Sequence, residues 1–263
     1  MNKKFLIVGF GNMGSSLYDG LIKIIDKESV YVCETFEEKM SLIEESNKTT
    51  DINQFLDIVD YVIFAIKPQF FLNLIPALDI NLDQKTIVSI MAGVSIDSLR
   101  KHLKGIKIVR SIPNIAASID EGVIGWIATD EVPNEDKDFL KRVFSNLGTE
   151  IELHSENMID KMTALSASGP AYFYYICEIL TNKAIEFGFS EKDALKIARA
   201  TFIGSAELMG RNNKTAEEWK QKVTSKKGTT QAALEYLDSK NFREIFSEAL
   251  ERAKNRSIEL NNN

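Results

Sequence analysis

The sequence predicts an α/β domain with a doubly wound parallel sheet, followed by an all-helical domain. Short apolar runs rich in Ile and Val recur through the first half of the chain, with amphipathic segments between them. Because polar residues hardly interrupt these runs, they are typical of strands covered on both faces. After about residue 155 the strand-like runs stop and helical spacing continues. We therefore predict two domains, residues 1–153 and 154–263, which suits a chain of 263 residues.

The predicted strands are the runs FLIVGF, VYVCE, YVIFAI, TIVSIM, IKIVRSI and GVIGWIA. The predicted helices of this half cover residues 13–25, 36–45, 69–78 and 95–103. Pro68 suits a first helical turn, because proline lacks an N–H that the helix start leaves unpaired. Strand and helix alternation implies right-handed βαβ crossovers. In the helical half, Thr215 with Glu218 matches a capping box, and Ser190 with Asp193 resembles one.

Composition excludes several classes of function. The formal net charge of -6 argues against a general nucleic-acid binder. Two cysteines and two histidines give no metal-ligand spacing, no disulfide framework and no material for a His-dependent triad. The apolar start breaks at glycine without a cleavage site, and the stretch AYFYYICEIL is too short to span a bilayer. We expect a cytoplasmic protein that binds neither metal nor membrane.

The strongest local motif is GFGNMG at residues 9–14, between the first predicted strand and the first helix. Gly9 permits a tight turn, Gly11 lets the backbone approach a pyrophosphate, and Gly14 lets helix and strand pack closely. The helix start then offers free N–H groups to an anion. A glycine-rich turn without a ligand is the alternative. The strand, the helix and a second strand at the right distance favour a Rossmann-like dinucleotide site.

Other candidate residues follow the later strands, whose carboxyl ends form the ligand crevice of such a sheet. Glu34 ends the second strand, twenty residues after Gly14, where a carboxylate can accept hydrogen bonds from the adenosine ribose. An exposed acid at a strand end is an equal alternative. Lys67 could face the cofactor or be a solvated loop lysine. The segments SIMAG and RSIPN also close strands, beside the expected nicotinamide.

Two segments of the helical half stand out. Residues 164–175 combine small residues with an aromatic run, too apolar for a lone surface helix. We therefore predict an obligate, intertwined homodimer. Residues 224–230, TSKKGTT, precede the helix QAALEYL, so that glycine, hydroxyls and a helix start together form a small anion site. Simple N-capping of that helix by Thr229 or Thr230 is the alternative.

Together these segments resemble the pyrroline-5-carboxylate reductase family, which carries out the last step of proline synthesis. The matching pieces, in order, are GFGNMG, AIKPQ, SIMAG, RSIPN, TALSASGPAY and VTSKKGTT. The ending FREIFSEALERAKNRS is also similar to the family's last helix, so the resemblance covers nearly the whole chain. An ordered set of six motifs is far more specific than any one of them.

The resemblance implies roles for individual residues. Those implied for the pyrophosphate are Gly9, Gly11, Asn12, Met13 and Gly14. Those implied for the ribose and nicotinamide are Ala65, Lys67, Pro68, Ala92, Gly93, Pro113 and Asn114. Those implied for the substrate, mainly its carboxylate, are Ser225, Gly228, Thr229 and Thr230. A helical dimerisation domain, with active sites that border a partner subunit, is also implied.

The implied reaction is hydride transfer from NADPH or NADH to the imine of 1-pyrroline-5-carboxylate, giving L-proline. A protonated imine accepts hydride directly, so positioning does most of the work and no metal is needed. Thr230 is the candidate catalytic hydroxyl near the imine nitrogen.

Three departures from the family pattern leave alternatives open. Ile115-Ala116 stands for the usual Thr-Pro, Lys226-Lys227 for Pro-Gly, and Ala167 for a frequent glycine. One alternative is a family paralogue that binds nucleotide without turnover and has a regulatory role. A hydroxyacid dehydrogenase or imine reductase of similar design is another, but Lys161 and Lys183 lie outside the stretch where its catalytic lysine is expected.

The choice between the two dinucleotides is also open. Glu34 with no following Arg favours NADH, since a 2′-phosphate prefers a cation there. Lys39 is the sole nearby cation of this segment, on a predicted helix that could turn it away. The resemblance to the family favours NADPH, which many of its members use.

Overall fold

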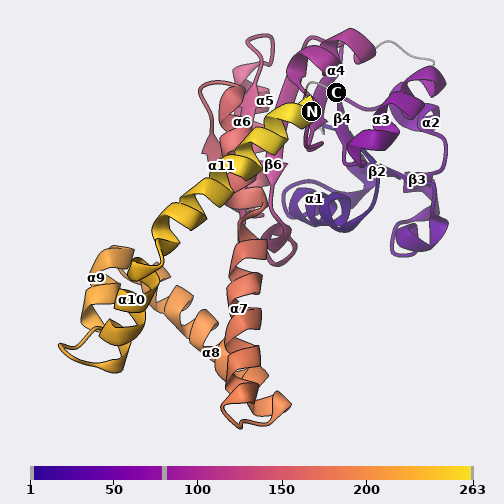
Figure 1. Ribbon diagram of the computed structural model, residues 1–263. Coiled ribbons are helices and arrows are strands. Elements are labelled where there is room, and N and C mark those ends of the chain that lie inside the picture. Colours follow the sequence, from indigo (N-terminus) through magenta and orange to yellow (C-terminus); the bar gives the residue numbers. More distant parts are fainter. Residues whose placement is uncertain (1–2, 79–81, 262–263) are drawn as a thin grey trace. The chain divides into compact units, whose positions relative to one another are not determined.

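The computed structural model describes residues 3–78 and 82–261, which form two compact units (Figure 1). One unit consists of the chain up to Ser168 together with the chain from Arg252 onward, and the other is Gly169–Glu251. This division differs from the predicted boundary between residues 153 and 154. The reason is packing, because Ile159 and the partly buried Met162 join Ile112 and Leu153 in one apolar cluster on the sheet.

The first unit contains a sheet in the order β3-β2-β1-β4-β5-β6-β7-β8 within the described residues. Its strands are β1 (Phe5–Val8), β2 (Val30–Cys33), β3 (Lys48–Thr49), β4 (Tyr61–Phe64), β5 (Thr86–Ser89), β6 (Ile108–Pro113), β7 (Gly122–Ala128) and β8 (Gly148–Glu152). Every neighbouring pair is parallel except β6 with β7, which is antiparallel. The predicted doubly wound α/β fold is confirmed, and its parallel sheet includes one antiparallel pair, β6 with β7.

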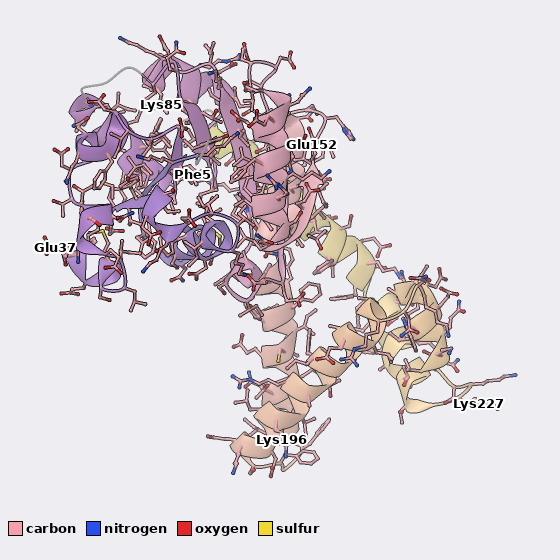
Figure 2. All side chains as sticks on the ribbon, turned by 180° about the vertical axis from the view of Figure 1, so that it is seen from behind. Phe5, Glu37, Lys85, Glu152, Lys196 and Lys227 are labelled. Atoms are coloured by element: carbon pink, nitrogen blue, oxygen red, sulfur yellow. The ribbon has the colours of Figure 1, made fainter. Side chains whose placement is uncertain are left out.

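The central strands carry almost no polar residues because both of their faces are covered. All residues of β1, β2, β4 and β5 are buried. Most of their apolar side chains alternate between two large apolar clusters, one on each face of the sheet, and Val32 of β2 joins a smaller cluster with Phe10, Met40 and Ile43. In Figure 2, Phe5 of β1 lies among the side chains of this unit. Because β1 has β2 on one side and β4 on the other, the strand order reverses at β1, where α/β sheets bind ligands.

The helices of this unit are α1 (Asn12–Ile22), α2 (Asn53–Leu56), α3 (Pro68–Leu74), α4 (Ile96–Leu103), α5 (Asn134–Ser145) and α6 (Asn157–Met162). Pro68 occupies the first turn of α3, as predicted. The helix predicted over residues 36–45 is wrong, because two 3₁₀ turns, Glu37–Met40 and Glu45–Asn47, stand there. The segment 36–45 lacks a complete apolar stripe, since Met40 and Ile43 are buried but Leu42 is 93% exposed.

Asp136 of α5 anchors that helix to the sheet at the edge opposite the glycine motif. Its carboxylate accepts hydrogen bonds from Tyr61 Oη at 2.6 Å and Thr86 Oγ1 at 3.1 Å, and it pairs with Lys3. Lys3 Nζ also donates to Tyr61 Oη at 2.9 Å. Burial alone would raise the pKa of Asp136, but these donors outweigh burial and lower it. The folded protein therefore favours the ionised carboxylate.

Asp136→Asn is expected to lower the free energy of unfolding at neutral pH by about 2 kcal/mol, since a neutral amide replaces the part-buried carboxylate, and Lys3 keeps only its longer ion pair with the exposed Glu135, at 3.3 Å. Because folding lowers the Asp136 pKa, its contribution is present above the unfolded pKa and is lost as pH falls through the folded value. Urea titrations across about pH 3–7 should therefore converge for wild type and variant at the acid end. Asp138→Asn, on the exposed side of α5, is the control. A constant gap at all pH values would contradict this account.

The second unit contains α7 (Gly169–Glu186), α8 (Glu191–Gly210), α9 (Ala216–Lys222), α10 (Thr229–Ser239) and the first half of α11 (Phe242–Asn261). Thr215 and Glu218 form the predicted capping box of α9. For α8, Ser190 Oγ accepts the Asp193 N–H, which is half of such a box. Among the described residues, no helix combines the length and apolar character that a membrane crossing requires.

This helical unit has almost no core of its own. Within Gly169–Glu251 the buried hydrophobic residues are Ala184, Ala194 and Ala198. Large apolar side chains are instead exposed, and the most exposed on α7 are Tyr174 and Tyr175, each at 64%. A folded unit that exposes so much apolar surface is typical of one completed by a partner.

Candidate functional site

Two of the three motif glycines are required by the chain's own packing. Gly9 has a φ of 95°, and a Cβ there would lie 2.8 Å from the Ala65 carbonyl oxygen. A Cβ on Gly14 would lie 2.1 Å from the Gly9 carbonyl oxygen. Both distances are far below a normal contact, so any larger residue would displace backbone. The turn from β1 into α1 therefore depends on glycine at these two positions.

Gly11 has no such requirement from the protein. A Cβ built there meets no described heavy atom within 4 Å, and its φ of -81° suits any residue. Gly11 is the N-cap of α1, and no described side chain caps this helix. The N–H groups of Asn12 and Met13 in the first turn are thus among those that a helix leaves unpaired. The loop fits a group that approaches the backbone closely and carries negative charge.

Glu34 is held tightly against the glycine loop. Its Oε2 accepts the Phe10 N–H at 2.9 Å, and its Oε1 accepts the Phe36 N–H at 3.1 Å and Thr35 Oγ1 at 3.2 Å. Lys39 Nζ lies 3.4 Å from Oε2. Burial alone would raise the pKa of Glu34, but these donors lower it. The expectation that Lys39 could be turned away is wrong, and Glu34 is an internal partner of the loop.

The end of β4 lies beside the same loop. The Ala65 N–H donates to the Val8 carbonyl at 2.8 Å, and the Ala65 Cβ would lie 3.5 Å from a Cβ on Gly14. Lys67 is the exposed N-cap of α3, with Pro68 following it. Ala65 is thus brought against the glycine motif, while Lys67 and Pro68 lie at the sheet's carboxyl edge with their side chains in solvent.

Residues after β5 and β6 are engaged in contacts within the first unit. Gly93 has a φ of 73°, and a Cβ there would lie 2.8 Å from the Leu260 Cβ of α11. The packing of α11 therefore requires this glycine. Asn114 donates from Nδ2 to the Ser166 carbonyl at 3.2 Å and accepts the Val123 N–H at 3.2 Å. Pro113 is buried in β6, and Ala92 packs on the cluster around Ile112.

The hydroxyl-rich loop of the second unit has a built geometry. The Gly228 N–H donates to the Ser225 carbonyl at 3.0 Å, and a Cβ on Gly228 would lie 2.3 Å from Ser225 Oγ. Gly228 is the N-cap of α10, and no described side chain caps this helix. Capping by Thr229 or Thr230, the alternative drawn from the sequence, is therefore wrong. Both threonines lie in the first turn, where unpaired N–H groups attract an anion.

Lys227 gives this loop an unusual backbone. It has a φ of 59°, in the left-handed region that favours glycine, and its N–H donates to Gln231 Oε1 at 2.7 Å. Its side chain projects into solvent (Figure 2). Lysine stands here where the family pattern usually has glycine, so the chain keeps the turn at the cost of local strain.

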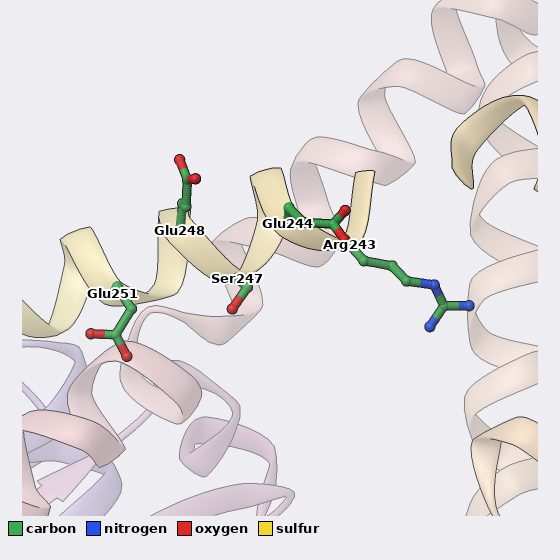
Figure 3. A pocket seen from close by; sticks show the side chains of 5 residues that line it. All are labelled: Arg243, Glu244, Ser247, Glu248 and Glu251. Atoms are coloured by element: carbon green, nitrogen blue, oxygen red, sulfur yellow. The ribbon is translucent and has the colours of Figure 1, made fainter. Parts of the chain in front are cut away.

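A surface hollow on the second unit carries no recognisable chemistry. Figure 3 shows its lining, which consists of side chains of α11. They are Arg243, Glu244, Ser247, Glu248 and Glu251. They belong to one helix face, with no wall from a second element. Among the described residues, no group of three His, Cys, Asp or Glu side chains could hold a metal.

Comparisons with known proteins agree with this geometry. Residues 156–260 match the model of pyrroline-5-carboxylate reductase dimerisation, and residues 4–93 match that of NADP oxidoreductase, coenzyme F420-dependent. The chain is 33% identical to the pyrroline-5-carboxylate reductase of Aquifex aeolicus over 258 residues, covering 97% of this chain and 96% of the relative.

Solved structures are similar over the full length. The pyrroline-5-carboxylate reductase of Coxiella burnetii has a TM-score of 0.87 and 30% identity, covering 99% of both chains. The Plasmodium falciparum pyrroline carboxylate reductase, solved with NADP bound, has a TM-score of 0.86 and 26% identity, covering 99% of this chain and 98% of that one. On this sequence identity and coverage, the chain belongs to the pyrroline-5-carboxylate reductase family.

Proposed function

We propose that this protein reduces 1-pyrroline-5-carboxylate to L-proline with NAD(P)H, as an oxidoreductase acting on a C–N bond. The observation that carries the proposal is the pairing of two anion-binding helix starts on one chain of this family. One follows Gly11 at the start of α1, and the other follows Gly228 at the start of α10. The dinucleotide and the imine acid are both anions, and each helix start fits one of them.

The dinucleotide site is proposed at the carboxyl edge of β1 and β4. The backbone of Gly9 to Gly14 would hold the pyrophosphate, with Asn12 and Met13 offering their N–H groups. Glu34, Ala65, Lys67 and Pro68 would flank the ribose side, and Ala92, Gly93, Pro113 and Asn114 would frame the nicotinamide. When bound, the cofactor supplies the hydride. The fit is supported by Gly11, because no contact among the described residues requires a glycine at this position.

The substrate site is proposed at the start of α10. Ser225, Gly228 and Thr229 would bind the carboxylate through hydroxyl and backbone N–H groups, favoured by the positive end of the helix dipole. The Thr230 hydroxyl would lie at the imine nitrogen and hold the protonated ring in position. A protonated imine is already electrophilic, so orientation and the exclusion of water are the remaining tasks of the protein.

The division of labour follows the same proposal. Residues 1–153 would bind the dinucleotide, and residues 154–263 would dimerise and contribute the substrate loop. We also propose that the enzyme is cytoplasmic, a location in which free thiols such as those of Cys33 and Cys177 stay reduced.

A steady-state assay tests the function directly. The purified protein is given 1-pyrroline-5-carboxylate with NADPH or NADH, and proline is measured as well as cofactor oxidation. We expect stoichiometric proline with at least one cofactor. Dinucleotide binding without turnover would instead support the regulatory paralogue.

We predict that the protein is an obligate homodimer or a larger assembly of dimers. The reason is the exposed apolar surface of α7 and α8 together with the missing core of the helical unit. Sedimentation at micromolar concentration should detect no monomer, whereas Tyr174→Glu should release monomers without activity. Leu42→Glu, an exposed leucine of the first unit, should leave the assembly unchanged. A fully active monomer would refute the prediction.

A further inference from the structure

The carboxylate of Glu34 has little capacity left for a ribose. A carboxylate offers about four acceptor positions. Four donors already approach this one, namely the Phe10 and Phe36 N–H groups, Thr35 Oγ1 and Lys39 Nζ. The Glu34 side chain is only 9% exposed. Glu34 therefore acts first as a support that ties the glycine loop to the edge of β2.

The exposed segment 35–39 carries one cation, Lys39, beside the two exposed acids Glu37 and Glu38. The Lys39 side chain is 46% exposed, and its Nζ lies 4.6 Å from the centre of the Phe36 ring. Phe36 is itself 63% exposed. Lys39 thus lies between an aromatic face and a buried carboxylate, with nearly half of its side chain exposed.

We propose that Lys39 binds the 2′-phosphate of NADPH at this edge. The enzyme would then accept both dinucleotides, although the carboxylate of Glu34 after β2 disfavours a phosphate. This inference rests on the proposed function, because it assigns a specificity residue for the same cofactor site. A phosphate near β2 needs a cation within reach, and Lys39 is paired with the carboxylate that occupies that place. The pair is long at 3.4 Å and the Lys39 side chain is 46% exposed, so Lys39 can turn to a phosphate while the buried Glu34 keeps its other donors.

The geometry favours Lys39 over its neighbours. Lys27 is paired with Glu44 at 3.0 Å, and Lys48 is paired with Glu45 at 2.6 Å. When Lys39 turns away, Glu34 keeps the Phe10 and Phe36 N–H groups, so the glycine loop retains its support. The exchange therefore disturbs the pyrophosphate site little.

Calorimetric titration with 2′,5′-ADP and 5′-AMP isolates the contribution of the 2′-phosphate, since the two fragments differ in that group alone. We expect Lys39→Gln to weaken 2′,5′-ADP binding by about tenfold, the value of one charge-assisted hydrogen bond, and to change 5′-AMP binding by less than about twofold. Lys39→Arg should restore 2′,5′-ADP binding. Lys27→Gln, which removes a paired lysine of the same unit, should affect neither fragment.

Steady-state kinetics provide the second measurement. Lys39→Gln should raise KM for NADPH by about tenfold and leave kcat/KM for NADH nearly unchanged. An equal loss for both fragments, or no loss for either, would overturn the role of Lys39. A wild-type protein that binds 2′,5′-ADP through Lys39 but forms no proline would refute the proposed function and leave this inference standing.

Discussion

Thr230→Ala is expected to lower kcat/KM for the imine by about 100-fold, the range of a positioned acid or hydrogen-bond donor, while the melting temperature hardly changes. The structural basis is the start of α10, where Gly228 rather than a threonine is the N-cap. Removing the Thr230 hydroxyl therefore removes no cap. Under the proposed function the lost interaction is one with the substrate, so it should register in the catalytic constants alone.

Thr215→Ala is the matched control for this experiment. Thr215 does cap its helix, and its Oγ1 accepts the Glu218 N–H at 3.2 Å. Its loss should lower the free energy of unfolding by about 1 kcal/mol and leave turnover intact. Thermal melts and proline formation are measured on both variants. If Thr230→Ala melts early and turns over normally, its hydroxyl is structural and Thr230 is not at the imine.

Gly11→Ala should weaken cofactor binding with little loss of stability, whereas Gly14→Ala should destabilise the fold. A Cβ on Gly11 meets no described atom within 4 Å, so the only expected cost to stability is that alanine is a poorer N-cap than glycine, which lowers the unfolding free energy by about 1 kcal/mol. The same methyl group would occupy the space through which a pyrophosphate approaches, so NAD(P)H should bind at least about tenfold more weakly.

Gly14→Ala instead forces a Cβ to within 2.1 Å of the Gly9 carbonyl oxygen, and the sheet unit should lose most of its stability. Urea unfolding and fluorescence titration with NADPH separate the two effects. Wild-type cofactor affinity in folded Gly11→Ala would contradict a pyrophosphate at this loop. A Gly14→Ala protein as stable as the wild type would contradict the close packing of α1.

The sequence predicted the parts of the fold that depend on local pattern. The buried strands β1, β2, β4 and β5 are recognisable as uninterrupted apolar runs, and Pro68 marks the start of α3. Strand direction is different, because the run GVIGWIA has the same composition whichever way it pairs. The exposed edge strand β8 alternates as GTEIE and has no continuous apolar run, so it was not predicted.

The candidate site also has parts that the sequence predicts and parts that it does not. The glycine motif could be predicted because its spacing follows from the turn that it builds. The contact of Gly93 with Leu260 joins residues far apart in the sequence, and so does the bridge from Asn114 to Ser166. The Phe10 N–H that supports Glu34 is a backbone group, which no residue pattern reveals. Only the folded chain brings these partners together.

The shortage of buried side chains in Gly169–Glu251 has a thermodynamic consequence. A unit whose buried apolar residues are three alanines is expected to be unstable alone, so we expect its folding and the association of subunits to be one reaction. The melting temperature should then rise with protein concentration, and refolding should slow on dilution as a second-order process. On this expectation, the stability of the protein would depend on its concentration as well as on its sequence.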